Sequence, residues 1–112
     1  MDGIIVDNMT YYANNSGIGY PQIKLIHKIN CELTFVLDGS MTYYINDKQY
    51  IIKKNDAVLI KPGMFLRRPK GNNAVSYVSF NFTVYDNDSL TDEIHLKSVV
   101  TPFNKNIRSQ RI

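Results

Sequence analysis

Residues 19–39 read GYPQIKLIHKINCELTFVLDG. This stretch mixes β-branched, aromatic and polar residues without helical spacing, which is typical of β-strands. It ends on Gly39, and glycine accepts the positive φ of a tight turn. Within it, His27 stands five positions before Glu32, and Glu32 stands seven before Gly39. The segment therefore predicts strands and a turn, with His27 and Glu32 five positions apart.

Similar segments recur along the chain and predict an all-β barrel or sandwich. Turn-forming residues separate them, as in Asn46-Asp47-Lys48, which lies between the strand-forming runs Tyr43-Tyr44-Ile45 and Gln49-Tyr50-Ile51-Ile52 and predicts a hairpin. Helical periodicity is nearly absent before residue 86. We expect strands at residues 3–6, 9–13, 22–28, 31–38, 41–46, 49–53, 57–61, 65–68 and 74–85.

The composition limits the class of protein. The 112 residues, 44% of them apolar, suffice for one compact domain with a modest core. The net charge of +3 is too small to argue for nucleic-acid binding. The single cysteine, Cys31, has no partner for an internal disulfide, and no signal-peptide pattern opens the chain. Apolar runs reach only about four residues, against roughly 18 for a spanning helix, so we expect a soluble cytoplasmic protein without a membrane partner.

The character of the sequence changes after residue 85, where a polar stretch begins. We expect residues 1–85 to form the barrel with an N-terminal arm. Residues 86–112 are expected to form a polar linker and the start of a truncated dimerisation helix. That short C-terminal helical segment would run from Phe103 to Ile112, with Thr101-Pro102 at its start. A helix cut off this early predicts that the chain is a piece of a longer protein.

The intervals within residues 19–39 resemble the first sequence motif of cupins, which reads Gly, five residues, His-x-His, three or four residues, Glu, six residues and Gly. The matching residues are Gly19, His27, Glu32 and Gly39, and Leu25 replaces the first histidine.

The second cupin motif is much weaker. Only Gly63 keeps its spacing, and Leu66 stands where that motif has its histidine. In cupins, inward histidine and glutamate side chains hold a divalent ion, and such a site normally needs three or more protein ligands. Because two of the four ligand positions are leucines here, we expect neither a metal ion nor another cofactor.

A longer part of the sequence resembles the N-terminal domain of AraC-type transcription regulators. The segments that carry the resemblance are Glu32–Gly39, Tyr43–Tyr50, Asn55–Gly63 and Tyr77–Phe80. It implies a cupin-like double-stranded β-helix, also called a jelly-roll barrel, that binds a small-molecule effector such as a sugar or an organic acid. It also implies a homodimer, and contact with DNA only through a C-terminal helix-turn-helix part absent from this chain.

Alternation along the strands selects candidate ligand-binding residues. If Glu32 points into the barrel, so does Thr34, and Tyr77 and Ser79 share one face of the last long strand. A tyrosine ring with a nearby hydroxyl can orient a polyol or sugar, although Tyr77 packing with its hydroxyl in water remains open. The cupin spacing implies that His27 and Glu32 both point into the lumen, where they either contact a ligand or form an ordinary polar pair at the barrel mouth.

Two arginines complete the candidate set. Arg67 and Arg68 are adjacent, so alternation sends them to opposite faces and one of them enters the lumen. The inward guanidinium either grips a carboxylate or phosphate of a ligand or pairs with Glu32, unless both arginines belong to a solvated charge cluster. His95 is expected to be exposed. Residues 11–19 resemble the arm that closes over the lumen in AraC-type regulators, and Asn14-Asn15-Ser16-Gly17 either hinge this arm or form a plain loop.

Three functions compete. The first is the sensing of an effector by a domain that needs no catalytic group, so that the protein is not an enzyme. The second is a stand-alone cupin enzyme with His27 and Glu32 around a metal, against which Leu25 and Leu66 argue. The third is a metal-free binding or oligomerisation module whose interior is filled by its own side chains.

Overall fold

The computed structural model describes residues 19–84 and 90–98, together with the backbone of residues 6–14. Every regular element in these residues is a β-strand, which confirms the all-β prediction. The strands are β1 (Val6–Asn14), β2 (Ile23–His27), β3 (Cys31–Asp38), β4 (Ser40–Ile45), β5 (Lys48–Lys53), β6 (Ala57–Ile60), β7 (Phe65–Arg68), β8 (Ser76–Val84) and β9 (His95–Leu96). The expected helical segment from Phe103 to Ile112 lies outside the described residues.

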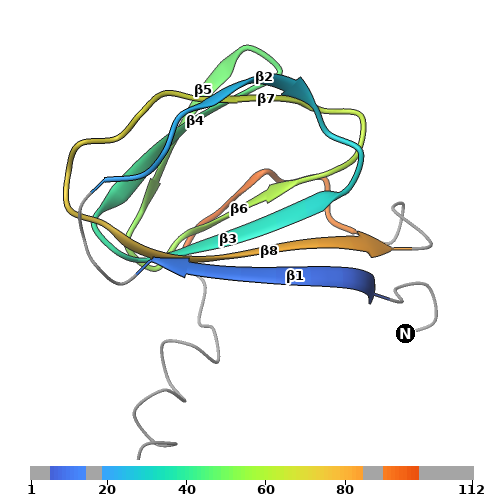
Figure 1. Cartoon of the computed structure of the whole chain (residues 1–112), viewed down its shortest axis with the longest axis horizontal. Coiled ribbons are helices and arrows are strands. Elements are labelled where there is room, and N and C mark those ends of the chain that lie inside the picture. Colours follow the sequence, from blue (N-terminus) through green and yellow to red (C-terminus); the bar gives the residue numbers. More distant parts are fainter. Residues whose placement is uncertain (1–5, 15–18, 85–89, 99–112) are drawn as a thin grey trace, which may run out of the picture.

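The strands form two antiparallel sheets that face each other (Figure 1). One sheet has five strands in the order β1-β8-β3-β6-β9, and the other has four in the order β2-β7-β4-β5. From β5 to β8, consecutive strands alternate between the sheets, so the chain winds around a shared interior. This winding is that of the predicted cupin-like jelly roll.

The predicted hairpin of β4 and β5 is confirmed. Tyr43 pairs with Tyr50, and Ile45 pairs with Lys48. Asn46 has a φ of 51° and Asp47 a φ of 65° in the connecting turn. Asparagine and aspartate tolerate this left-handed conformation better than most residues, and two such residues in succession match the twist of a two-residue hairpin.

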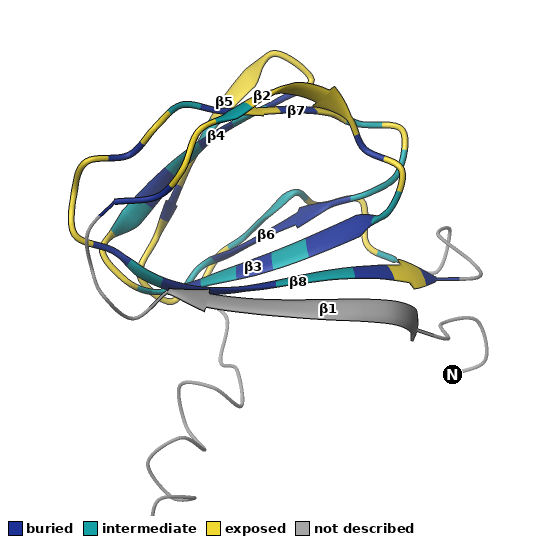
Figure 2. Cartoon of the chain, in the orientation of Figure 1, coloured by how far each residue is buried: buried dark blue, intermediate teal, exposed yellow. Residues whose placement is uncertain are grey.

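The apolar core lies between the sheets. On β4, every second side chain is fully buried, whereas the residues between them are partly exposed on the outer surface (Figure 2). The largest buried apolar side chains that share this core are Val36, Met41, Tyr43, Ile45, Ile52, Val58, Ile60, Leu66, Val75 and Tyr77. Burial of such side chains is the main stabilising term of a small β domain.

The five-stranded sheet also buries its second face. Cys31, Phe82 and Val84 form a separate apolar cluster there, with Leu33 and Leu90 packed against it. In the same sheet, all four residues of β6 are buried. A strand buried on both faces has a continuous apolar sequence rather than an alternating one, which explains the run Ala57–Ile60.

Residues 90–98 lie against the edge of this sheet. β9 pairs with β6, and the backbone N–H of Leu59 donates to the carbonyl of Ile94 at 2.9 Å. The expectation that His95 is exposed is wrong, because its ring is half-buried and its Nε2 lies 2.8 Å from Asp56 Oδ2. The division of the chain at residue 85 stays a prediction, although β9 adds a strand to the sheet beyond that position.

Asp56 holds this segment with both carboxylate oxygens. Oδ2 contacts His95, and Oδ1 accepts a hydrogen bond of 2.9 Å from the backbone N–H of Ser98. Burial disfavours the charged carboxylate, but the hydrogen bonds from Ser98 and His95 and the charge of His95 outweigh burial and lower the pKa of Asp56 below its usual 3.8. The ionised form of Asp56 is therefore the one that stabilises the fold.

Replacing Asp56 with asparagine is expected to lower the free energy of unfolding at pH 7 by about 1–2 kcal/mol, since charge-assisted hydrogen bonds are lost. The depressed pKa means that this stabilisation is complete above pH 3.8 and disappears as the pH falls through the lower pKa of the folded state. Denaturant unfolding between about pH 2.5 and about pH 7, a range that brackets that pKa, should show a shallower acid slope for Asp56→Asn than for the wild type. Asp38→Asn, at an exposed carboxylate on β3, is the control; equal slopes for the two variants would contradict the assignment.

Gly39 and Gly63 provide a matched test of turn geometry. Both have positive φ, at 81° and 93°, but a Cβ at Gly39 would collide with the carbonyl oxygen of Ala74, whereas a Cβ at Gly63 meets no atom within 4 Å. Gly63→Ala is expected to cost about 1–2 kcal/mol from backbone strain alone, and Gly39→Ala at least about 3 kcal/mol because the collision adds to the same strain. Equal losses in urea unfolding would show that the turn at Gly39 relaxes freely.

Candidate ligand-binding site

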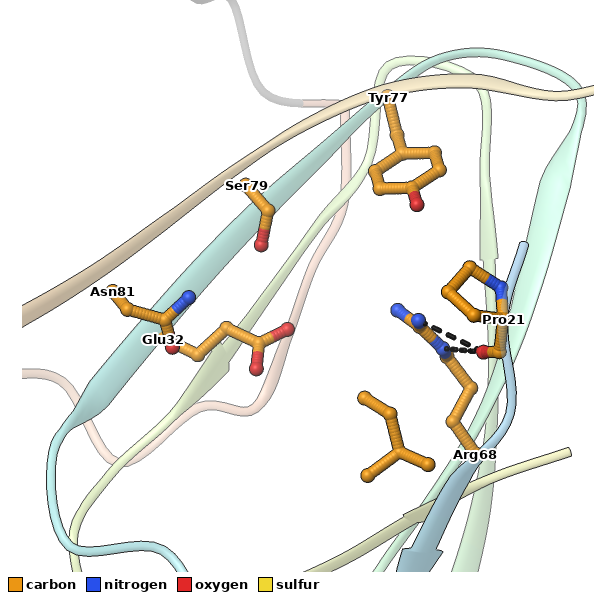
Figure 3. Close-up of a pocket in the computed structure, with 7 residues that line it drawn as sticks. Pro21, Glu32, Arg68, Tyr77, Ser79 and Asn81 are labelled. Carbon is orange, nitrogen blue, oxygen red and sulfur yellow. Dashed lines mark hydrogen bonds between the residues drawn. The ribbon is translucent and has the colours of Figure 1, made fainter. Parts of the chain in front are cut away.

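A cavity of about 320 Å³ lies between the two sheets. The five-stranded sheet presents Glu32, Ser79 and Asn81 to it, and Arg68 of the four-stranded sheet faces them (Figure 3). Among the described residues, the lining consists of Pro21, Ile23, Glu32, Arg68, Tyr77, Ser79 and Asn81. Strand alternation along β8 brings Tyr77 and Ser79 to this one face, as the sequence predicted, and Asn81 lies on the same face.

Glu32 is the centre of the polar part of the interior. Its side chain is almost completely buried, and both carboxylate oxygens accept hydrogen bonds. Thr34 Oγ1 donates to Oε2 at 2.9 Å, and the hydroxyl of Tyr43 donates to the same oxygen at 3.3 Å. Lys28 Nζ donates to Oε1 at 3.4 Å. A buried carboxylate is tolerated only with such partners.

Lys28 is the cation that neutralises Glu32, and sequence analysis missed it. Only 8% of the residue is exposed, and its ammonium also donates to Asn81 Oδ1 at 3.2 Å. Backbone hydrogen bonds to Gly63 and Met64 fix the loop that carries it. A lysine in a loop is usually exposed, and no local pattern marked this one, because the groups that hold it inward come from distant parts of the chain.

Tyr43 joins Glu32 to Arg68. Burial raises the pKa of the Tyr43 hydroxyl well above its ordinary 10.0 and the neighbouring Glu32 raises it further, whereas Arg68 lowers it. The phenol therefore stays protonated at neutral pH. The hydroxyl donates a hydrogen bond to Glu32 and accepts one of 3.2 Å from Arg68 Nη1. The alternation of β4 places Tyr43 inward, so its position could have been found from the sequence.

Arg68 lines the cavity from the four-stranded sheet and is 6% exposed. Its Nε and Nη2 both donate to the carbonyl oxygen of Pro21, at 3.1 and 2.9 Å. The rings of Tyr20 and Tyr43 lie 5.2 and 5.6 Å from the guanidinium carbon, within the range of cation–π attraction. These contacts fix the direction of the guanidinium without supplying a negative charge.

Thr34 connects two residues of the cavity wall, Glu32 and Ser79, through its hydroxyl group. The hydroxyl oxygens of Thr34 and Ser79 lie 2.6 Å apart. Because Thr34 uses its one hydrogen on Glu32, Ser79 is the donor in this pair. The lone pairs of the Ser79 oxygen remain able to accept a further hydrogen bond from the cavity.

The other two predicted site residues lie outside the interior. Arg67 is exposed and stacks on the ring of Tyr44 at 4.0 Å, as expected for the neighbour of an inward Arg68. The expectation that His27 points into the lumen is wrong. Its ring is exposed, stacks on Phe65 at 4.7 Å, and lies 3.2 Å from the carbonyl oxygen of Gly63. The register of β2 against β7 sets His27 opposite Phe65, an outward residue, so His27 and Glu32 do not form a pair.

The residues at the cupin ligand positions do not fit a metal centre. Leu25 is 63% exposed, Leu66 is part of the apolar core, and His27 lies outside, which leaves Glu32 as the single inward ligand. Over residues 19–84 and 90–98, no three His, Cys, Asp or Glu side chains stand close enough together to hold an ion.

A second hollow lies on the outer surface between Leu25, Asn46, Asp47 and Phe65, with a volume of about 410 Å³. It is the larger of the two, but its lining side chains are exposed. A binding site needs convergent polar groups, and of these two hollows the interior cavity provides them.

The Glu32 and Lys28 pair can be tested by unfolding measurements. Glu32→Leu is expected to lower the free energy of unfolding by about 3–5 kcal/mol, because it leaves a buried ammonium without its counter-charge. Adding Lys28→Met to that variant should recover part of the loss. Asp92→Ala, which breaks the surface pair between Lys61 and the exposed Asp92 carboxylate, is the control and should leave stability unchanged within error. A Glu32→Leu variant as stable as the control would refute the role given to Glu32.

Comparison with known proteins gives one family match. The family model described as AraC-like ligand binding domain matches residues 11–100. No curated protein matches the chain. Among solved structures, a cupin protein from Bacteroides fragilis is similar at 20% identity and a TM-score of 0.45, covering 90% of this chain and 80% of its own. A protein from Neisseria meningitidis is similar at 14% identity and a TM-score of 0.49, covering 71% of this chain and 82% of its own.

None of the described residues belongs to a helix long and apolar enough to cross a membrane.

Proposed function

The chain belongs to the family of AraC-like ligand binding domains, and on this basis we propose that it senses a small-molecule effector in the cavity between its two sheets. The proposed contacts are Glu32, Arg68, Tyr77 and Ser79 at the cavity, with Thr34 holding Glu32 and Ser79 in position. His27 and Arg67, also candidates from the sequence, lie outside this cavity and are not part of the proposed site.

One observation carries the proposal: buried polar side chains converge on a hollow instead of filling it. Glu32 and Arg68 line the hollow and are each less than 10% exposed, as is Lys28, which pairs with Glu32. Burying charged groups is costly, and apolar residues of similar size often stabilise a core as well or better. The same interior has a solid apolar core beside the cavity. A binding role explains why charged groups stand at the hollow, whereas a domain that serves only oligomerisation has no use for them.

Signalling requires the effector to favour one conformation over another. The cavity wall includes residues from both sheets. A ligand that contacts both Arg68 and Ser79 therefore changes the relative free energies of conformations that differ in the distance between these two residues. β8, which carries Ser79, pairs with β1, the strand that leads toward residues 15–18. The predicted closing arm includes these four residues, which lie outside the described residues. We propose that the domain works as a homodimer and that DNA is contacted only by a part of the regulator beyond this chain.

Catalysis is not part of the proposal. The chain does not present the ligand set of a cupin metal centre, as the outward His27 and the buried Leu66 illustrate. The family match supports a sensing role. The stand-alone cupin enzyme therefore has less support than the sensor.

Blocking the cavity tests the proposal. Ile23→Trp narrows the cavity without removing a hydrogen bond, and Ile51→Trp makes the same change at an exposed position on the same sheet. A screen of sugars and organic acids by thermal unfolding should find compounds that stabilise the wild type by about 2.7 kcal/mol at a concentration of 100 times Kd. The stabilisation should persist in Ile51→Trp and disappear in Ile23→Trp. If no sugar or acid stabilises the wild type, or if both variants respond alike, the interior cavity is not the effector site.

A further inference from the structure

We infer that the effector carries a carboxylate, which Arg68 binds through its guanidinium. The inference rests on the proposed function, because it concerns the ligand of the same cavity. It selects small carboxylic acids over neutral sugars and over phosphate esters.

The first argument is the charge of the interior. Among the described residues, the buried charged side chains are two cations, Lys28 and Arg68, and one anion, Glu32. Two positive charges and one negative charge leave an excess of one positive charge. Buried charges are normally paired, because an unpaired ion loses its hydration without compensation. A ligand with one negative charge would restore the balance.

The second argument locates the excess charge on Arg68. Glu32 forms its ion pair with Lys28. Arg68 donates only to neutral acceptors, the carbonyl of Pro21 and the hydroxyl of Tyr43. Within the described parts of the chain, no carboxylate forms an ion pair with Arg68. Its charge is therefore the one that lacks a partner.

The third argument is the number of hydrogen-bond donors. A guanidinium has five N–H groups, and Arg68 uses three of them on Pro21 and Tyr43. Of the two that remain, one is on Nη1 and one is on Nη2. The guanidinium that carries them points toward the space between Glu32 and Tyr77 (Figure 3). Paired N–H groups of an arginine match the two oxygens of a carboxylate in spacing and in charge.

The size and sign of the charge select the acid class. A phosphate monoester carries about −1.5 to −2 charges near neutral pH, which exceeds the single positive charge available. A neutral sugar would leave Arg68 without its counter-charge. Opposite Arg68, Ser79 and Asn81 offer hydrogen-bonding groups suited to hydroxyls. A cavity of about 320 Å³ limits the ligand to a small molecule. The inferred class is therefore a small monocarboxylic acid, with hydroxy acids and sugar acids as its best-fitting members.

The test uses probes that share a carbon skeleton and differ in charge. Lactate is compared with lactamide, and galacturonate with galactose and galactose 1-phosphate, by isothermal titration and thermal unfolding of the wild type. At least one acid should bind, and at least 10-fold more tightly than its neutral counterpart. Arg68→Gln should weaken acid binding by about 10- to 100-fold, because a charge-assisted pair of hydrogen bonds is lost.

Two further variants separate the role of Arg68 in binding from its role in folding. Arg68→Lys keeps the charge and loses the paired donors, so it should bind the acid with intermediate affinity. Arg67→Gln removes the neighbouring guanidinium, which lies outside on Tyr44, and should bind like the wild type. The comparison of acid with amide in the wild type needs no variant and decides the question even if Arg68→Gln does not fold.

Each remaining outcome has a definite meaning. If galactose binds as well as galacturonate and Arg68→Gln leaves both unchanged, the carboxylate inference is overturned and the proposed sensing function stands. If galactose 1-phosphate binds most tightly, the ligand is an anion of another class and the inference fails. If no probe binds and the compounds that stabilise the wild type through the cavity are all uncharged, the acid class is wrong. If nothing binds at all, the proposed function falls together with the inference.

Discussion

The buried carboxylate of Glu32 is the constraint on which the interior depends. It stands on β3 of the five-stranded sheet and accepts a hydrogen bond from Tyr43 of the four-stranded sheet. Its other oxygen faces the ammonium of Lys28, which belongs to the loop between the sheets. One anion therefore links both sheets and their connection. Because a desolvated charge is stable only while its partners stay in place, this group sets the distance between the sheets around it.

The cavity is a consequence of that constraint. Apolar side chains can shift to fill a gap, but the groups around Glu32 are directed by hydrogen bonds and cannot move inward without losing them. Thr34 and Ser79 are held in the same way, at 2.6 Å from each other. Arg68 is fixed by Pro21 and Tyr43. The polar groups that make the cavity costly also keep it open and direct their remaining donors and acceptors into it, which is the preorganisation that a binding site requires.

Sequence reasoning located most of the strands and many inward residues, and its failures have a common cause. Alternation from Glu32 correctly placed Thr34 inward, and alternation along β8 did the same for Tyr77 and Ser79. It failed for His27, because a motif spacing was used in place of the register of β2 against β7, which turns that ring outward. It also failed for His95, whose burial depends on pairing with β6 and on the carboxylate of Asp56. In both cases the deciding contact lies more than 30 positions away in the sequence.

The sequence by itself determined the all-β class, the hairpin at Asn46-Asp47, and which side chains share a face of each strand. These properties follow from the backbone period of two and from the φ preferences of a few residues, both of which are local. Only the tertiary structure decided that Lys28 neutralises Glu32 and that Arg68 has no anionic partner. The balance of charge between the two sheets depends on which strands face each other. That arrangement is set by long-range packing, and no local pattern encodes it.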